Sequence, residues 1–150
     1  MKELEALGFL IGRWRGTSED QFGVKGTLVS TMEGTFEPSE KFIQLRGENH
    51  NNGKLVNRAV QFITYDAKIR KYVAKRIWSM GFIENGAGTW DGKELVLRIT
   101  FDCEPPFFRA MRWKSFIRRY TENEIGTGLF AAKTGGKYRL YGEARHVRIT

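Results

Sequence analysis

The sequence has few of the residues that form covalent cross-links and metal centres. Its 150 residues include one cysteine, Cys103, and two histidines, His50 and His146. One cysteine excludes an intramolecular disulfide, and so few thiols and imidazoles exclude the usual zinc and iron–sulfur ligand sets. No apolar run approaches the roughly 18 residues of a membrane-spanning helix. We therefore expect a core held by apolar packing, with no metal site and no membrane span.

Catalytic signatures are also missing, although glycine is frequent at 17 residues. There is no Gly-x-Ser-x-Gly elbow and no phosphate-binding loop. Gly86-Ala87-Gly88 and Gly126-Thr127-Gly128 lie in strand-like segments without a following helix, so they indicate bends or close packing. We predict no catalytic residue and expect a binding protein more than an enzyme, with enzymatic activity left open.

Acidic residues are scarce in the C-terminal third of the chain. Residues 105–150 hold 10 basic and 3 acidic side chains, whereas residues 1–104 hold 15 and 14, within a net charge of +8. Such a basic half suits an acidic partner, or it forms a solvated face. The first residues carry acids where a secretory signal would carry bases and an apolar stretch, so a cytoplasmic location is expected.

Alternating apolar and polar residues dominate the chain after a short helical opening at residues 2–10. Residues 26–36 alternate most clearly, and Asn51-Asn52-Gly53-Lys54 and Asp91-Gly92 are typical of hairpin turns. About ten short strands follow one another with short links, which favours antiparallel neighbours. The sequence therefore predicts an all-β fold: one domain over residues 1–150, a closed antiparallel up-and-down barrel of about ten strands with a short N-terminal helix. A two-sheet sandwich is the alternative.

The opening Leu7-Gly8-Phe9-Leu10-Ile11 followed by Gly12-Arg13-Trp14-Arg15-Gly16 resembles the start of calycin-type domains, which include fatty-acid-binding proteins, lipocalins and the haem-binding nitrobindins. It is most similar to a group of uncharacterised prokaryotic lipocalin-like domains, which share the Leu-Ile-Gly-x-Trp-x-Gly opening and a turn like Tyr65-Asp66. The resemblance implies that Gly12, Trp14 and Gly16 close one end of the barrel. It also implies that an arginine of the last strand, Arg145 or Arg148, packs over Trp14.

A ten-stranded barrel is wide enough to hold a small molecule, so a ligand cavity is expected. Alternate residues of a strand point to the same face, and this places arginines beside apolar residues expected to point inward. Arg58, for example, shares a face with Val60 and Phe62. In fatty-acid-binding proteins, inward arginine and tyrosine bind a carboxylate, and the resemblance implies a similar set here. We predict an intracellular carrier or sensor for a hydrophobic, fatty-acid-like and possibly anionic ligand. The predicted ligand-binding residues are Arg58, Tyr72, Arg76, Trp78, Trp113, His146 and Arg148.

Two alternative functions remain open from the sequence. The first is haem binding, since the resemblance to nitrobindins implies an axial histidine near the C-terminus, and His146 is the candidate. The second is nucleic-acid binding through the basic strand 109–119, which carries Arg109, Arg112 and Lys114 with interleaved aromatic residues, and which is the less favoured of the two. A homo-oligomer is left open, and Cys103 is expected to be a buried, inert thiol.

Overall fold

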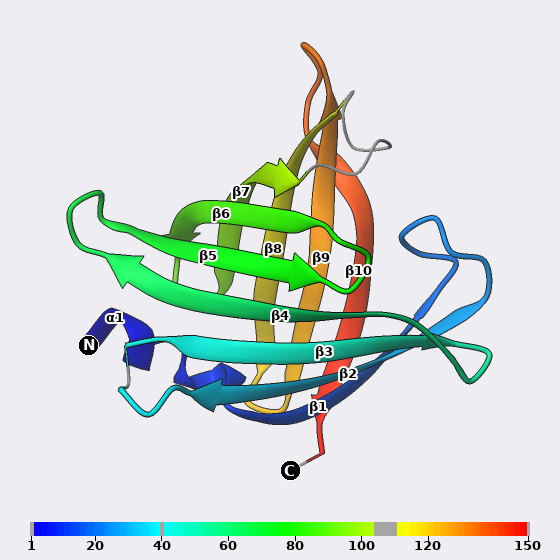
Figure 1. Ribbon diagram of the computed structural model, residues 1–150, viewed down its shortest axis with the longest axis horizontal. Coiled ribbons are helices and arrows are strands. Elements are labelled where there is room, and N and C mark those ends of the chain that lie inside the picture. The colour runs from blue at the N-terminus through cyan, green and yellow to red at the C-terminus, as the bar shows by residue number, and fades with distance from the viewer. Residues whose placement is uncertain (1, 40, 104–110, 150) are drawn as a thin grey trace.

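The chain folds into a closed barrel of ten antiparallel strands (Figure 1). In this computed structural model, the residues described are 2–39, 41–103 and 111–149. Helix α1 (Lys2–Glu5) and a 3₁₀ turn, η1 (Gly8–Leu10), precede the barrel. The strands are β1 (Gly12–Glu19), β2 (Thr27–Phe36), β3 (Ile43–Asn51), β4 (Lys54–Asp66), β5 (Lys71–Trp78), β6 (Ile83–Trp90), β7 (Glu94–Cys103), β8 (Met111–Thr121), β9 (Glu124–Lys133) and β10 (Arg139–Arg148). The predicted fold class is confirmed.

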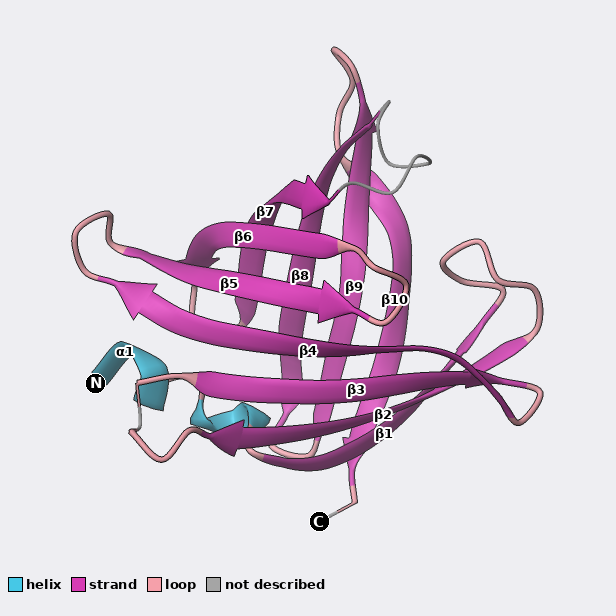
Figure 2. Cartoon of the chain, in the orientation of Figure 1, coloured by secondary structure: helices cyan, strands magenta, loops and turns pink. Residues whose placement is uncertain are grey.

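Each strand pairs with its neighbour in sequence, and β1 closes the ring by pairing with β10. The turns are short because the chain places glycines and Asn where the backbone needs a positive φ. Asn52 and Gly53 have φ of 52° and 75°, which is the geometry of a tight hairpin between β3 and β4. In the part of the chain that the structure describes, helix lies beside one end of the barrel, next to the N-terminus, and nowhere else (Figure 2). This topology leaves no β-sheet edge free along most of the wall.

The N-terminal segment seals one end of the barrel, which we call the closed end. Leu4, Leu7 and Leu10 are at most 1 % exposed and pack with Trp14, which has no exposed surface. The Trp14 indole Nε1 donates to the Leu10 carbonyl over 3.2 Å. The predicted helical opening at residues 2–10 therefore serves as a plug, and most of the fully buried side chains of the barrel lie around it.

Arg148 is the arginine of the last strand that covers Trp14. Its guanidinium carbon lies 4.3 Å from the indole centroid. Its Nη1 donates to the Ile11 carbonyl over 2.6 Å and its Nη2 to the Phe9 carbonyl over 2.8 Å. Arg145 instead lies over Tyr120 on the outside of the barrel. The choice that the sequence left open between Arg145 and Arg148 is thus decided by the structure.

The glycines of the opening motif permit close packing at β1. A Cβ at Gly16 would clash with the Arg145 carbonyl oxygen and would lie 2.9 Å from Cδ2 of His146. Gly12 has a φ of 124°, a conformation that other residues rarely adopt. Gly12 therefore allows the bend from η1 into β1, and Gly16 makes room for the side chain of the facing strand.

Candidate functional site

The end opposite the N-terminal plug opens into a cavity of about 280 Å³. This volume is close to the lower limit of ordinary small-molecule sites. Most of the wall is apolar, with side chains from nearly all strands and from the loop between β1 and β2. The apolar lining residues are Phe22, Val24, Leu28, Met32, Leu45, Val56, Ala59, Met80, Phe82, Phe116, Ile117, Leu129, Tyr141 and Ala144. The cavity therefore suits a guest with a large apolar part.

The inward face of β4 is the reverse of the one predicted. Ala59 and Gln61 line the cavity, and Ile63 is fully buried in the core. Arg58 is exposed on the outer surface, so its placement in the cavity was wrong. β4 has apolar residues on both faces, and a register shift at Asn49/His50 in the β3–β4 ladder adds a further irregularity.

An ion pair lies inside the cavity on β5 and β6. Nε of Arg76 is 3.4 Å from Oε2 of Glu84, and Nε1 of Trp78 donates to the same oxygen over 2.7 Å. The side chains of Arg76 and Glu84 are 20 % and 9 % exposed. The guanidinium carbon of Arg76 also lies 5.4 Å from the Trp78 ring centroid. The structure thus brings two predicted site residues together, around a carboxylate that the sequence analysis did not single out.

The pair leaves hydrogen-bonding capacity facing the cavity. Nε of Arg76 faces Glu84, and neither terminal nitrogen of Arg76 makes a hydrogen bond to another described residue. Gln61 stands opposite Arg76 in the β4–β5 register and is 5 % exposed. Its side-chain amide also makes no hydrogen bond within the described part of the chain. A polar group of a ligand could therefore bind here without breaking the ion pair.

A second polar group lies across β2, β3 and β4. Oγ of Ser30 donates to Oδ1 of Asn49 over 2.5 Å, and Nδ2 of Asn49 donates to Oδ1 of Asn57 over 2.7 Å. All three residues line the cavity. These three side chains carry no charge, so they offer hydrogen bonds alone.

His146 is buried in the wall on β10, with 3 % of its surface exposed. Burial lowers its pKa from 6.5 to about 4, and the Ala144 backbone opposes that shift only in part. The imidazole is therefore neutral near pH 7. Its Nδ1 is fully buried and makes no hydrogen bond of normal geometry to any described residue. His146 lines the cavity, as predicted from parity, and presents an uncharged ring there.

The loop between β1 and β2 covers the seam where β1 and β10 part. β1 pairs with β10 only over Trp14–Thr17, and beyond it Oε1 of Gln21 accepts from the Glu143 backbone N–H over 3.2 Å. The Phe22 ring packs on Gly142, where a Cβ would lie 2.9 Å from the ring. Phe22 also meets the Tyr141 ring edge-on at 6.4 Å. An aromatic cluster thus forms the cavity wall at this seam.

Besides Arg58, three predicted site residues lie elsewhere than on the cavity surface. Trp113 is 4 % exposed and packs edge-on against Tyr141, with ring centroids 5.0 Å apart, so it supports the wall from behind. Tyr72 lies at the closed end, where its hydroxyl donates to the Glu3 carbonyl over 2.6 Å. Arg148 lies over Trp14 at the same end. The predicted roles of Tyr72 and Arg148 in ligand binding do not agree with these positions.

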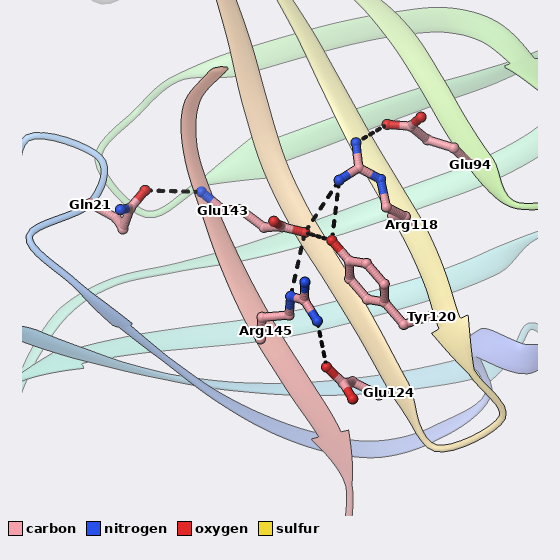
Figure 3. A network of polar contacts seen from close by, with 7 residues as sticks. All are labelled: Gln21, Glu94, Arg118, Tyr120, Glu124, Glu143 and Arg145. Atoms are coloured by element: carbon pink, nitrogen blue, oxygen red, sulfur yellow. Dashed lines mark hydrogen bonds and ion pairs between the residues drawn. The ribbon is translucent and has the colours of Figure 1, made fainter.

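The outer face of β8, β9 and β10 holds the basic strand in a network of paired charges (Figure 3). Nη2 of Arg118 lies 2.9 Å from Oε1 of Glu94, and Nη1 of Arg145 lies 2.7 Å from Oε1 of Glu124. The Tyr120 hydroxyl donates to Glu143, and burial, together with this bond, raises the pKa of Tyr120.

Aromatic side chains of the basic strand are not available for stacking with bases. Phe116 is 1 % exposed and packs at 4.8 Å from Phe130, and Trp113 is buried as well. Arg112 donates to the Gly136 carbonyl over 2.7 Å. Arg109 lies outside the described residues. Because the aromatic rings are covered, we do not propose nucleic-acid binding.

Cys103 is exposed at the end of β7, so the prediction of a buried thiol was wrong. A register shift between Ile83 and Glu84 interrupts the β6–β7 ladder at this point. The alternation that holds from Leu95 to Phe101 therefore does not continue to Cys103. No group of three or more His, Cys, Asp or Glu side chains among the described residues could hold a metal ion.

The strands and the wall define a type of fold: a closed antiparallel barrel of calycin-like, lipocalin-type architecture with an internal cavity. Two solved structures share this fold. Rv2717c from M. tuberculosis superposes with a TM-score of 0.66 at 14 % identity, over 100 % of this chain and 99 % of that chain. The S-type phycobiliprotein lyase CPES from Guillardia theta gives 0.62 at 16 % identity, over 98 % and 92 %.

At such identities the likeness concerns the fold alone. No family model matches the chain, and no curated protein matches it in sequence. Within the described residues, none of the helices has the length and apolar character needed to cross a membrane.

Proposed function

We propose that this protein is a carrier or sensor that binds a small, largely apolar molecule in the barrel cavity, with an anionic or strongly polar group of the ligand at Arg76. The observation that carries the proposal is a mainly apolar cavity of about 280 Å³ with one arginine on its wall. The terminal nitrogens of that arginine are free among the described residues. Fatty-acid-like molecules are one ligand class with this combination of an apolar body and an anionic group.

Charge complementarity supports the position of the polar group. A half-buried guanidinium is costly to desolvate without a partner, and Glu84 meets that need through one nitrogen only. The remaining four N–H bonds of Arg76 can bind a carboxylate in the bidentate geometry that arginine favours. Gln61, directly opposite, can donate a further hydrogen bond. The apolar part of the ligand would then lie against residues such as Met32 and Leu129.

The phycobiliprotein lyase has the same fold, and its name shows that a barrel of this shape can act on another protein. We take from it only that such barrels can be binding proteins. The ligand class proposed here depends on the wall of this chain and not on that likeness.

The test uses the anionic dye 1-anilinonaphthalene-8-sulfonate as a reporter and displaces it with decanoate or with decanol. The two competitors share a ten-carbon chain and differ in the charge of the head group. We expect the wild type to bind decanoate more tightly than decanol. The ratio of these two affinities should fall about tenfold in Arg76→Met, because a charge-assisted hydrogen bond is lost. Arg58→Met is the matched control, since Arg58 lies outside the barrel, and it should keep the wild-type preference.

Two results would contradict the proposal. Failure of the dye and of both competitors to bind the folded wild type would show that the cavity takes no such molecule. An equal decanoate preference in the wild type and in Arg76→Met would remove Arg76 from the site. Far-UV circular dichroism of each variant confirms that the barrel is folded.

Haem is the second candidate, on the observation that His146 presents a neutral, buried imidazole to the cavity. The imidazole is in the form that binds iron. A porphyrin is a large guest for a cavity of about 280 Å³, so rim side chains such as Phe22 and Tyr141 would have to move. A Soret band on addition of haem that His146→Ala abolishes would favour this candidate. An unchanged haem spectrum would exclude His146 as the ligand.

A further inference from the structure

A row of uncharged polar side chains crosses half of the cavity wall. In the strand register His146 pairs with Gly16, Gly16 with Ser30, Ser30 with Asn49, and Asn49 with Asn57. Directly paired residues point to the same face of a sheet, so the row faces inward throughout. We call Ser30, Asn49 and Asn57 the polar row. The ion pair of Arg76 and Glu84 lies on β5 and β6, outside this row.

Hydrogen bonds within the polar row run in one direction and end at Asn57. Ser30 uses its only proton on Asn49, and Asn49 uses one amide proton on Asn57. Nδ2 of Asn57 has no acceptor among the described residues. Oδ1 of Asn57 accepts one hydrogen bond and retains its second lone pair. The last amide of the row therefore has a donor and an acceptor position that no described residue uses.

The row fixes the orientation of this amide. With Oδ1 of Asn57 held at 2.7 Å from Nδ2 of Asn49, the amide plane cannot flip without losing that bond. Ser30 in turn holds Asn49, and 7 % of the Ser30 surface is exposed. Two side chains thus orient a third, which reduces the entropy lost when a ligand binds to it.

We propose that Asn57 recognises an uncharged cis-amide edge of the ligand, such as a lactam, whose carbonyl accepts from Nδ2 and whose N–H donates to Oδ1. This inference rests on the proposed function, because it assumes that the cavity holds a small molecule. Ser30 and Asn49 are positioning residues that act through Asn57. The ligand class becomes a flat, mainly apolar molecule with a lactam-like edge, separate from the group that meets Arg76.

The test compares two compounds with the same two-ring frame. 2-Quinolinone carries a lactam edge, and naphthalene carries none; each displaces 1-anilinonaphthalene-8-sulfonate from the wild type. We expect 2-quinolinone to bind roughly tenfold more tightly, which corresponds to two neutral hydrogen bonds. In Asn57→Leu, which keeps the size of the side chain, the two compounds should bind equally. The Asn57 side-chain amide signals in ¹⁵N–¹H spectra should shift with 2-quinolinone and not with naphthalene.

A pair of serine variants tests the positioning role. Ser30→Ala should lower the preference for 2-quinolinone about threefold, whereas Ser115→Ala, at an equally buried serine outside the row, should not change it. A preference that persists in Asn57→Leu overturns the inference, as does equal binding of both compounds to the wild type. If decanoate binds in those cases, the proposed function stands. If neither the aromatic compounds nor decanoate binds, both proposals fail.

Discussion

Removal of His146 should flatten the pH dependence of stability in weak acid. The imidazole has a pKa of about 4 in the folded protein, because it is buried, and about 6.5 in an unfolded chain. Between these values the unfolded chain takes up a proton that the folded chain does not. The free energy of unfolding therefore falls as the pH drops through 6.5, and this contribution stops changing below about pH 4.

The magnitude follows from the two pKa values. From pH 7.5 to pH 5, uptake of this proton by the unfolded chain lowers the free energy of unfolding by about 2 kcal/mol. Carboxyl groups also titrate toward the lower end of this range, but they do so equally in a variant that lacks only the imidazole. The difference between wild type and His146→Gln therefore isolates the contribution of His146.

Urea unfolding at pH 7.5 and pH 5 measures the effect. The wild type should lose about 2 kcal/mol more between the two pH values than His146→Gln does. His50→Gln removes the other histidine, whose side chain is one-third exposed, and should retain the wild-type loss. Equal losses in the wild type and in His146→Gln would refute the argument that His146 is buried in its neutral form.

Two further predictions concern β1 and β10, the strands that close the barrel. Gly16→Ala should lower the free energy of unfolding by about 2 kcal/mol, because the added Cβ overlaps a backbone carbonyl. Gly8→Ala is the control and should have little effect, because the space around Gly8 is open. Chemical unfolding measures both variants, and equal stability of the two would contradict the close packing at Gly16. Arg148→Ala should cost about 3 kcal/mol through the loss of two charge-assisted hydrogen bonds and the contact with Trp14, while Arg145→Ala on the outer face should cost much less. Similar melting temperatures for the two arginine variants would show that Arg148 does not close the barrel.

The strand count and the closure of the barrel were predictable from the sequence. Alternation in stretches such as 26–36 and turn dipeptides such as Asp91-Gly92 are local signals, and short links leave antiparallel pairing as the simplest arrangement. The role of Trp14 was implied by the resemblance of the opening motif to calycin-type domains, and the structure gives its physical basis in a buried indole with an acceptor and close cover. These features depend on local sequence, so they could be recognised without coordinates.

The cavity wall was harder to predict because its polar residues break the alternation. On β4 the even positions, with Val56, Val60 and Phe62, are more apolar than the odd ones, yet Asn57 and Gln61 face inward. Alternation of apolar and polar residues identifies the strand face that packs into a core. A binding wall that carries polar side chains does not follow this alternation. Ile63 belongs to the core at the closed end, so every second residue counted back from it also faces inward. This count would have identified the inward face of β4 correctly.

Interactions between distant residues account for the other errors. Glu84 became a site residue only once β5 and β6 paired and brought it to Arg76. Likewise, the basic residues of 105–150 indicated a charged face in the sequence, whereas in the structure acids from β7, β9 and β10 pair with Arg118 and Arg145. Charge counts along a chain do not show which opposite charges the fold places beside one another.

The central claim is that the barrel interior binds a small apolar molecule, and a pair of adjacent substitutions tests it most directly. Ala59 lines the cavity, and Val60 points outward from the same strand. Isothermal titration with decanoate should show binding to the wild type and to Val60→Phe, and binding at least tenfold weaker to Ala59→Phe, whose ring fills the cavity. Absence of binding to the wild type, or unchanged affinity in Ala59→Phe, would contradict the account.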